Sequence, residues 1–314
     1  MDHRNDSMVT EFILLGLTDN PKLNMVLFVL FLLIYLLTVV GNVWVISIIL
    51  ASAQLHLPQY FFLSHLAFLD FCYSSVFIPK MLMNDITGEN VISYHGCLLQ
   101  YSFVNMFLTT ECFLLSAMAY DRYLAICHPL LYKGLMTPKI SICLVTASYL
   151  LGCASSVTHL SSLLHLSFCG PNIINHYFCD IPLLFQLSCS DTQHSQLLFI
   201  VLSGATSVST FSIVISSYLG ILLAVLKMHS ARGRCKALST CASHLTVVTL
   251  FYGTVIFTYL GTSSSYPQDT AKILSMFYTL LLPILNLLIY SMRNREAKEA
   301  MIRIIKRKIL AQGT

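Results

Sequence analysis

The sequence predicts an all-α membrane protein, a bundle of seven transmembrane helices followed by a short amphipathic C-terminal helix. The first observation is composition: the 314-residue chain is 56% hydrophobic and only 10% charged, with a mean hydropathy of +0.74. Soluble domains carry about 25% charged residues, so this chain has too few charges to cover a water-facing surface. The second observation is a series of seven long apolar runs. The third is an uneven distribution of Lys and Arg.

Each apolar run is compatible with a helix that crosses the hydrocarbon core, which takes roughly 20 residues. The runs are too long and too continuous for the strands of a membrane barrel, which alternate over about 10 residues. The sixth run is short, but the uncharged residues before it extend it. The predicted spans are residues 25–50, 61–79, 101–120, 140–157, 197–226, 245–260 and 273–292.

Three prolines fit this set of helices. Pro58 and Pro138 lie near the starts of the second and fourth spans, where the missing N–H costs little. Pro283 lies inside the seventh span, so we expect a kink that frees the carbonyl of Thr279.

The basic residues orient the bundle with the N-terminus outside. Only Arg4, Lys22, Lys80 and Lys272 then lie outside, whereas all other Lys and Arg lie inside, as the positive-inside rule requires. A glycosylation sequon at Asn5 agrees with an outer N-terminus. The sequence thus predicts a multi-pass plasma-membrane protein with an extracellular segment 1–24, a membrane domain 25–292 and a cytoplasmic tail 293–314.

Four of the eleven cysteines fall on the predicted outer side, where the oxidising environment favours disulfides. Cys97 opens the third span, and Cys169, Cys179 and Cys189 share one long outer loop. We favour Cys97–Cys179 with Cys169–Cys189. The pair Cys97–Cys189 is the alternative, because four cysteines allow three pairings.

Several functions are disfavoured by what the sequence lacks. The net charge of +4 gives no broad basic footprint for nucleic acid. No phosphate-binding loop, dinucleotide fingerprint or nucleophile elbow is present, so we do not expect an enzyme. Cys241 and His244 lie three residues apart, but two ligands do not make a zinc site, and we interpret them as packing or switch residues.

A set of short motifs lies at fixed places in the spans, and together they resemble the olfactory receptors, a branch of the rhodopsin-like G-protein-coupled receptors. The resemblance covers about residues 11–294. The motifs are "GN" at 41–42, "LHLPQYFFLSHLAFLD" at 55–70, "MAYDRYLAIC" at 118–127, "SY" at 217–218, "KALSTCASHL" at 236–245 and "PILNLLIYSMRN" at 283–294.

The chain departs from the family pattern at two places. The usual Pro-Met-Tyr of the second span reads Pro58-Gln59-Tyr60, and the usual Asn-Pro of the seventh reads Asn286-Leu287. Loss of the second proline restores one helical hydrogen bond, so Pro283 is left to supply the bend.

The resemblance implies a switch at the cytoplasmic end. Asp121, Arg122 and Tyr123 would form it, with the acid holding the guanidinium in the resting state. Tyr218 and Tyr290 resemble the tyrosines that meet Arg122 when the bundle opens. The expected mechanism is a population shift between two helix arrangements, each stabilised by a different partner of Arg122.

Two deeper acids, Asp70 and Glu111, lie inside spans, where ionisable groups usually mark functional sites. By resemblance, Asp70 belongs to the sodium pocket of rhodopsin-like receptors, and Asn42 and Asn286 would add oxygen ligands. We therefore hypothesise an allosteric Na⁺ that favours the resting state, and we expect no other cofactor. The alternative is a protonated, hydrogen-bonded pair without an ion.

The ligand cavity is expected between the outer halves of the third, fifth, sixth and seventh spans. The predicted lining is Val104, Asn105, Leu108, Thr109, Cys112, Phe199, Leu202, Ser203, Thr206, Tyr252, Val255, Ile256, Tyr259 and Thr279. Amine-binding relatives carry Asp where Val104 stands, and the set includes no base. A small, mostly apolar, neutral odorant is therefore expected.

The tail of the chain places Ala297, Met301, Ile304 and Ile305 on one helical face and bases on the other. This pattern predicts a short helix lying on anionic inner-leaflet lipid.

Taken together, the resemblance implies a receptor that couples odorant binding to a heterotrimeric stimulatory G protein and raises cyclic AMP. A membrane transporter of a small solute is the alternative, although the paired repeats typical of transporters are not evident.

Overall fold

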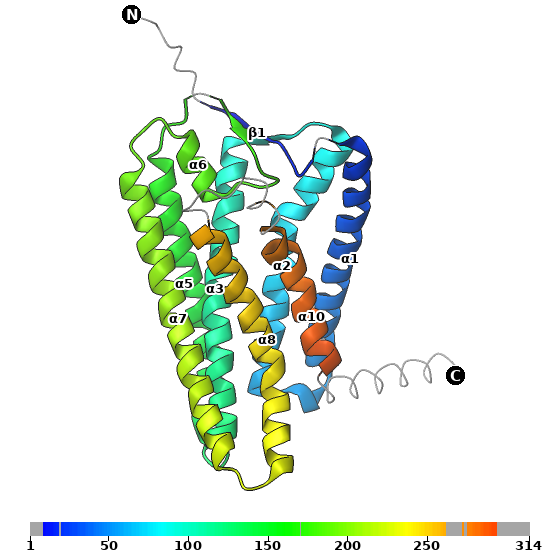
Figure 1. Cartoon of the computed structure of the whole chain (residues 1–314), viewed down its shortest axis with the longest axis vertical. Coiled ribbons are helices and arrows are strands. Elements are labelled where there is room, and N and C mark those ends of the chain that lie inside the picture. Colours follow the sequence, from blue (N-terminus) through cyan, green and yellow to red (C-terminus); the bar gives the residue numbers. More distant parts are fainter. Residues whose placement is uncertain (1–8, 19, 170, 262–271, 273–274, 294–314) are drawn as a thin grey trace, which may run out of the picture.

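The fold is a bundle of long helices that run alongside one another (Figure 1). The computed structural model describes residues 9–18, 20–169, 171–261, 272 and 275–293. Within these residues, six helices are long and apolar enough to cross a membrane, and a shorter apolar helix follows them. The six are α1 (Pro21–Ala51), α2 (Pro58–Thr87), α3 (Tyr94–Cys127), α5 (Pro138–Leu164), α7 (Gln193–Lys227) and α8 (Ala231–Gly261). The prediction of an all-α membrane fold is confirmed.

Proline and capping residues set where helices begin, as the sequence predicts. Pro58 and Pro138 are each in the first turn of their helices, and the Thr137 side chain accepts a hydrogen bond from the Ile140 N–H. The six long helices extend beyond the predicted spans. For example, α2 continues past Pro79 to Thr87 and is capped by Gly88, whose φ of 72° is the left-handed conformation that glycine adopts without strain.

The seventh helix is interrupted where its proline requires it. A π-helical turn, Phe277–Leu281, leads into α10 (Leu282–Arg293), and Pro283 lies at the junction. Proline cannot donate to the carbonyl four residues earlier, so the regular ladder has to be broken at this point. The predicted seventh span is described only over residues 275–292, and the predicted tail helix lies outside the described residues.

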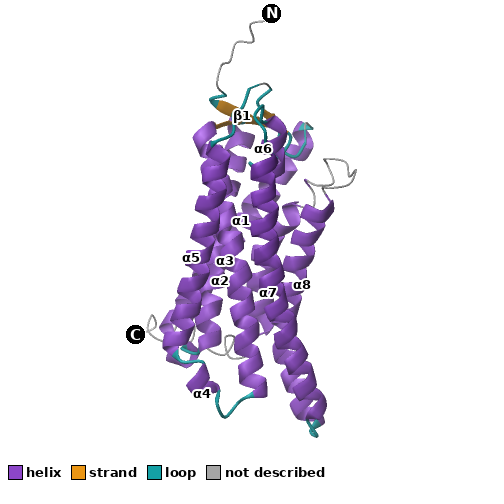
Figure 2. Ribbon diagram, turned by 90° about the vertical axis from the view of Figure 1, so that its left-hand side faces the viewer, coloured by secondary structure: helices purple, strands orange, loops and turns teal. Residues whose placement is uncertain are grey.

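One end of the bundle is covered by a small sheet of three strands, β2–β1–β3 (Figure 2). The central strand β1 (Glu11–Leu14) pairs antiparallel with β2 (Val91–Ser93) and parallel with β3 (Ile173–Ile174). The short helix α6 (Ile181–Leu187) lies at the same end. We call it the disulfide end.

Two disulfides join segments at the disulfide end. They connect Cys97 with Cys179 and Cys169 with Cys189, which is the pairing favoured from the sequence. The first ties the start of α3 to the loop between α5 and α7, and the second closes that loop on itself. Phe12 of β1 is fully buried and packs edge-on against Phe168 of the same loop.

The opposite end, which we call the Arg122 end, carries the loops between α3 and α5 and between α7 and α8. The first of these loops contains the single-turn helix α4 (Tyr132–Leu135) (Figure 2). A 3₁₀ turn, η1 (Ala53–Leu55), connects α1 to α2.

Helix α3 lies at the centre of the bundle. Of the residues in the most apolar 18-residue stretch of α3, 67% are buried within the protein, compared with 11% for the corresponding stretch of α1. Two glycines allow neighbouring helices to approach it closely. A Cβ at Gly152 of α5 would lie 2.7 Å from the Met106 carbonyl oxygen, and one at Gly220 of α7 would lie 2.5 Å from the Tyr123 ring. The outward faces of α1 and α7 expose large apolar side chains, which suits helices that face lipid.

Candidate functional site

Asp121 is held at the Arg122 end by a residue that the sequence did not single out. The Tyr132 hydroxyl of α4 donates a 2.7 Å hydrogen bond to Asp121 Oδ1. Burial, and then the negative charge of Asp121, raise the pKa of Tyr132 above its usual value, so this hydroxyl keeps the proton that it donates. Among the described residues no ion pair within 4.0 Å joins Asp121 to Arg122. Tyr132 thus engages one oxygen of the carboxylate that was expected to hold Arg122.

Of the two tyrosines expected to meet Arg122, Tyr218 is engaged elsewhere. The Tyr218 hydroxyl of α7 lies 2.7 Å from His244 Nδ1 of α8, within hydrogen-bonding distance. Tyr123 turns toward α7, where its ring fills the space left by Gly220, and its hydroxyl lies 3.2 Å from His128 Nε2. The Tyr290 side chain lies outside the described part of the structure.

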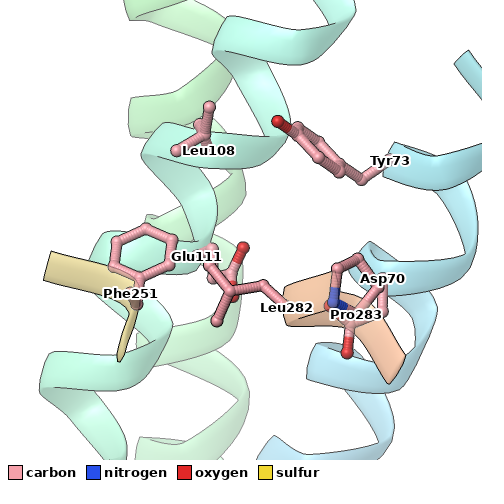
Figure 3. Close-up of a pocket in the computed structure, with 7 residues that line it drawn as sticks. All are labelled: Asp70, Tyr73, Leu108, Glu111, Phe251, Leu282 and Pro283. Atoms are coloured by element: carbon pink, nitrogen blue, oxygen red, sulfur yellow. The ribbon is translucent and has the colours of Figure 1, made fainter. Parts of the chain in front are cut away.

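The two buried acids share one amide. Asn286 Nδ2 of α10 donates to Asp70 Oδ1 at 3.1 Å and to Glu111 Oε1 at 3.4 Å, and all three side chains are at least 92% buried. Figure 3 shows Asp70, Glu111 and Pro283 around the same small space, which is closed by Tyr73, Leu108, Phe251 and Leu282. It has room for about one water molecule or ion.

The chemistry of this donor set is that of two acids and one amide. Two ionised carboxylates on one amide would repel each other, so the arrangement calls for a proton or a cation between them. Asn286 presents its nitrogen to both acids, and its Oδ1 is buried without a hydrogen-bond partner among the residues that the structure describes. A half-turn of the amide would direct that oxygen to a cation. Asn42 contributes less, because its Nδ2 donates to the Thr38 carbonyl of its own helix.

The predicted ligand-lining residues fall into several groups. Val104, Thr109, Cys112, Tyr252 and Thr279 are buried. A partly buried group comprises Leu108, Phe199, Leu202, Ser203, Thr206 and Val255. The Tyr259 side chain lies outside the described residues.

Among the buried residues, Tyr252 connects three helices. Its hydroxyl donates to Thr210 Oγ1 of α7 at 2.8 Å, and it also lies at hydrogen-bonding range of Cys112 in α3. Thr210, fully buried, was missed from the sequence. Its spacing of four from Thr206 on one helical face is the signal that could have found it.

Two predicted lining residues are placed elsewhere. Asn105 Nδ2 donates to Ser155 Oγ of α5 at 3.2 Å, so its amide is used at the α3–α5 contact. Ile256 has 44% of its surface exposed, which is the behaviour of an outward-facing residue. Both lie on helix faces whose orientation depends on how the helices pack, which the sequence pattern alone does not fix.

Thr279 is bound by the loop that covers the bundle. Its Oγ1 lies 2.7 Å from the Tyr177 hydroxyl, and Ser275 Oγ, one turn earlier, lies 3.1 Å from both the Tyr177 hydroxyl and His176 Nε2. The loop between α5 and α7 is thus hydrogen-bonded to the seventh helix. We call His176, Tyr177, Lys272, Ser275 and Thr279 the lid cluster.

A bundle with a disulfide-tied loop over one end and an Asp-Arg-Tyr sequence at the other has the architecture of a G-protein-coupled receptor. The crystal structure of squid rhodopsin is similar to this fold, with a TM-score of 0.72 over 90% of this chain and 81% of that chain, at 16% sequence identity. That likeness shows the fold.

The sequence comparisons are more specific. A family model described as olfactory receptor matches residues 31–308. Olfactory receptor 5AR1 of Mus musculus is 50% identical over 98% of this chain and 99% of its own length. Olfactory receptor 8U1 of Homo sapiens is 52% identical over 98% of this chain and all of its own length, 100%. The chain belongs to the olfactory receptor family. Family membership implies a multi-pass membrane receptor for a small molecule with a G protein as partner, and not an enzyme.

Proposed function

We propose that this chain is an odorant receptor of the plasma membrane, with its N-terminus and disulfide end outside the cell. It binds a small, mostly apolar molecule within the bundle, activates a stimulatory G protein at the Arg122 end and raises cyclic AMP. The C-terminal segment 293–314 lies on the inner leaflet. The observation that carries the proposal is about 50% identity to olfactory receptors over nearly the whole chain.

The geometry at the Arg122 end supports a resting state. Two of the three groups expected to bind Arg122 have other partners within the described residues: Asp121 accepts from Tyr132, and Tyr218 lies at hydrogen-bonding distance from His244. Activation then amounts to exchanging these partners, so that Tyr218 leaves His244 and meets Arg122. A ligand drives that exchange only by binding the second arrangement more tightly than the first.

The test is a cyclic AMP assay in transfected cells with a chemically broad odorant panel. We expect a subset of odorants to raise cyclic AMP, and Arg122→Ala to abolish the response at unchanged surface expression. Arg232→Ala, an exposed base at the same end, is the matched control and should retain the response. The proposal is rejected if Arg122→Ala responds as fully as the wild type. It is also rejected if no odorant of the panel raises cyclic AMP in cells with normal surface receptor.

We also propose that Asp70 and Glu111 hold Na⁺ in the resting state, with Asn286 turning its oxygen to the ion. The orphaned Asn286 Oδ1 supports this assignment. Replacing sodium with N-methylglucamine should then raise basal cyclic AMP in the wild type and not in Asp70→Asn. Basal activity that ignores sodium would favour the alternative, a protonated pair bridged by the amide.

A further inference from the structure

The lid cluster contains a buried base that the sequence placed simply among outer loop residues. Lys272 is only 7% exposed, and no carboxylate in the described part of the chain lies within 4.0 Å of its ammonium. A buried charge without a counter-ion is costly, so such a group is usually paired. Asp180, the acid closest in sequence to His176, accepts a hydrogen bond from the Ile181 N–H.

His176 presents a second unsatisfied atom in the same cluster. The Ser275 hydroxyl donates its only proton to the Lys272 carbonyl at 2.7 Å, so the 3.1 Å contact with His176 Nε2 requires the imidazole to donate there. Nδ1 is then the acceptor, and it is buried without a hydrogen-bond partner in the described part of the chain. Burial, and then the charge of Lys272, lower the pKa of His176 to about 3, so the ring is neutral.

The Lys272 ammonium and the His176 imidazole require complementary partners. The ammonium of Lys272 calls for an acceptor, preferably an anion, and the lone pair of His176 Nδ1 calls for a donor. A carboxylic acid supplies both, because its proton is shared with Nδ1 in a hydrogen bond to the imidazole, while the negative charge that this leaves on the carboxyl group is held by the ammonium. An alcohol supplies donor and acceptor on one atom and carries no negative charge.

We propose that Lys272 and His176 form an anchoring site for the carboxyl group of an aliphatic or aromatic acid, at the disulfide end of the ligand cavity. The remainder of the ligand lies toward the apolar side chains below, since Tyr177 belongs to the same hydrophobic cluster as Val104 and Leu280. This inference rests on the proposed function for the position of the cavity. It replaces the expectation of a neutral ligand, which followed from the lack of a base among the residues predicted to line the cavity.

The test measures binding directly, independently of signalling. The melting temperature of the purified full-length receptor is measured in the presence of straight-chain acids from acetic to decanoic acid and of benzoic acid. Each acid is compared with its methyl ester and its corresponding alcohol. We expect one or more acids to raise the melting temperature more than their esters and alcohols do. Lys272→Gln should weaken that acid by roughly tenfold or more and leave neutral ligands unchanged.

Two variants separate the charge from the fold. Lys272→Arg keeps the charge and should retain the preference for acids, whereas Lys22→Gln removes an exposed base at the same end and should change nothing. The proposal is overturned if no acid stabilises the receptor, or if Lys272→Gln binds acids as the wild type does. Acid binding that depends on Lys272 without a cyclic AMP response would sustain this site and reject the proposed function.

Discussion

Gly152 of α5 lies at the tightest point of the contact with α3, so Gly152→Ala is the most informative packing variant. A Cβ there would lie 2.2 Å from Thr110 Oγ1 and 2.7 Å from the Met106 carbonyl oxygen, whereas ordinary contact begins at 3.4 Å. The Thr110 hydroxyl cannot move freely, because it donates to that same carbonyl at 2.7 Å. α5 must therefore withdraw from α3 by roughly 1 Å, which opens a densely packed interface.

The expected cost follows from two opposing effects. Overpacking of this kind destabilises by about 1–3 kcal/mol. Replacing a mid-helix glycine with alanine stabilises by roughly 0.5–1 kcal/mol. Gly204 of α7 isolates the second effect, because a Cβ there meets nothing within 4 Å. The two variants should thus differ by about 1–3 kcal/mol, or several degrees at roughly 2–4 °C per kcal/mol.

The assay is thermal unfolding of purified receptor, with surface expression as a second readout. Gly152→Ala should melt below the wild type and Gly204→Ala at or above it. Adding Thr110→Ala should restore part of the loss, since it removes the closer contact but not the carbonyl. If Gly152→Ala melts as high as Gly204→Ala, the α3–α5 contact is looser than described and the reasoning fails.

Three further predictions concern the two ends and the first helix. Gly41→Ala would place its Cβ 2.1 Å from Leu287 Cδ2, the far end of a flexible side chain that can turn aside, so surface expression should fall less than in Gly152→Ala; an equal fall would contradict this reasoning. Leu130 is 97% exposed at the Arg122 end, so we expect this apolar side chain to contact the G protein. Leu130→Asp should then weaken G-protein activation and leave the ligand-induced shift in melting temperature intact, and a normal response would argue against that contact. Burial raises the pKa of Asp180 to about 6, so the folded chain holds this proton more tightly than the unfolded chain. Stability should fall as pH rises from about 4 to about 6, less so in Asp180→Asn, and a rise over that window would contradict the assignment.

The helices could be predicted from the sequence because their signals are local. Apolar length identifies a span, and Pro58 and Pro138 identify starts, without knowledge of any partner. The strand β1 could not be predicted in this way. It has four residues, and its partners at 91–93 and 173–174 are far along the chain, so its pairing depends on the bundle having formed.

In the candidate site, too, some residues can be identified from the sequence, whereas their long-range contacts cannot. Asp70 and Glu111 stand out as acids within apolar runs, and the structure brings both to Asn286. The partners of hydroxyl groups do not stand out. A serine or threonine in a helix can always donate to its own backbone, as Thr110 does to Met106. Sequence alone therefore gives no reason to prefer a particular tertiary partner.

This ambiguity of hydroxyl and amide groups has a consequence for ligand recognition. The contact between α3 and α5 uses polar groups of α3 whose partners the sequence did not predict: the Tyr101 hydroxyl lies 2.8 Å from His159 Nδ1, and Asn105 Nδ2 donates to Ser155 Oγ at 3.2 Å. In a bilayer such groups have to find partners within the protein, because lipid offers none. With the Asn105 amide engaged, the outer part of α3 presents mainly apolar surface and the Thr109 hydroxyl. The polar end of a ligand is then best served by the loop and the seventh helix, so its orientation in the cavity is set from the disulfide end.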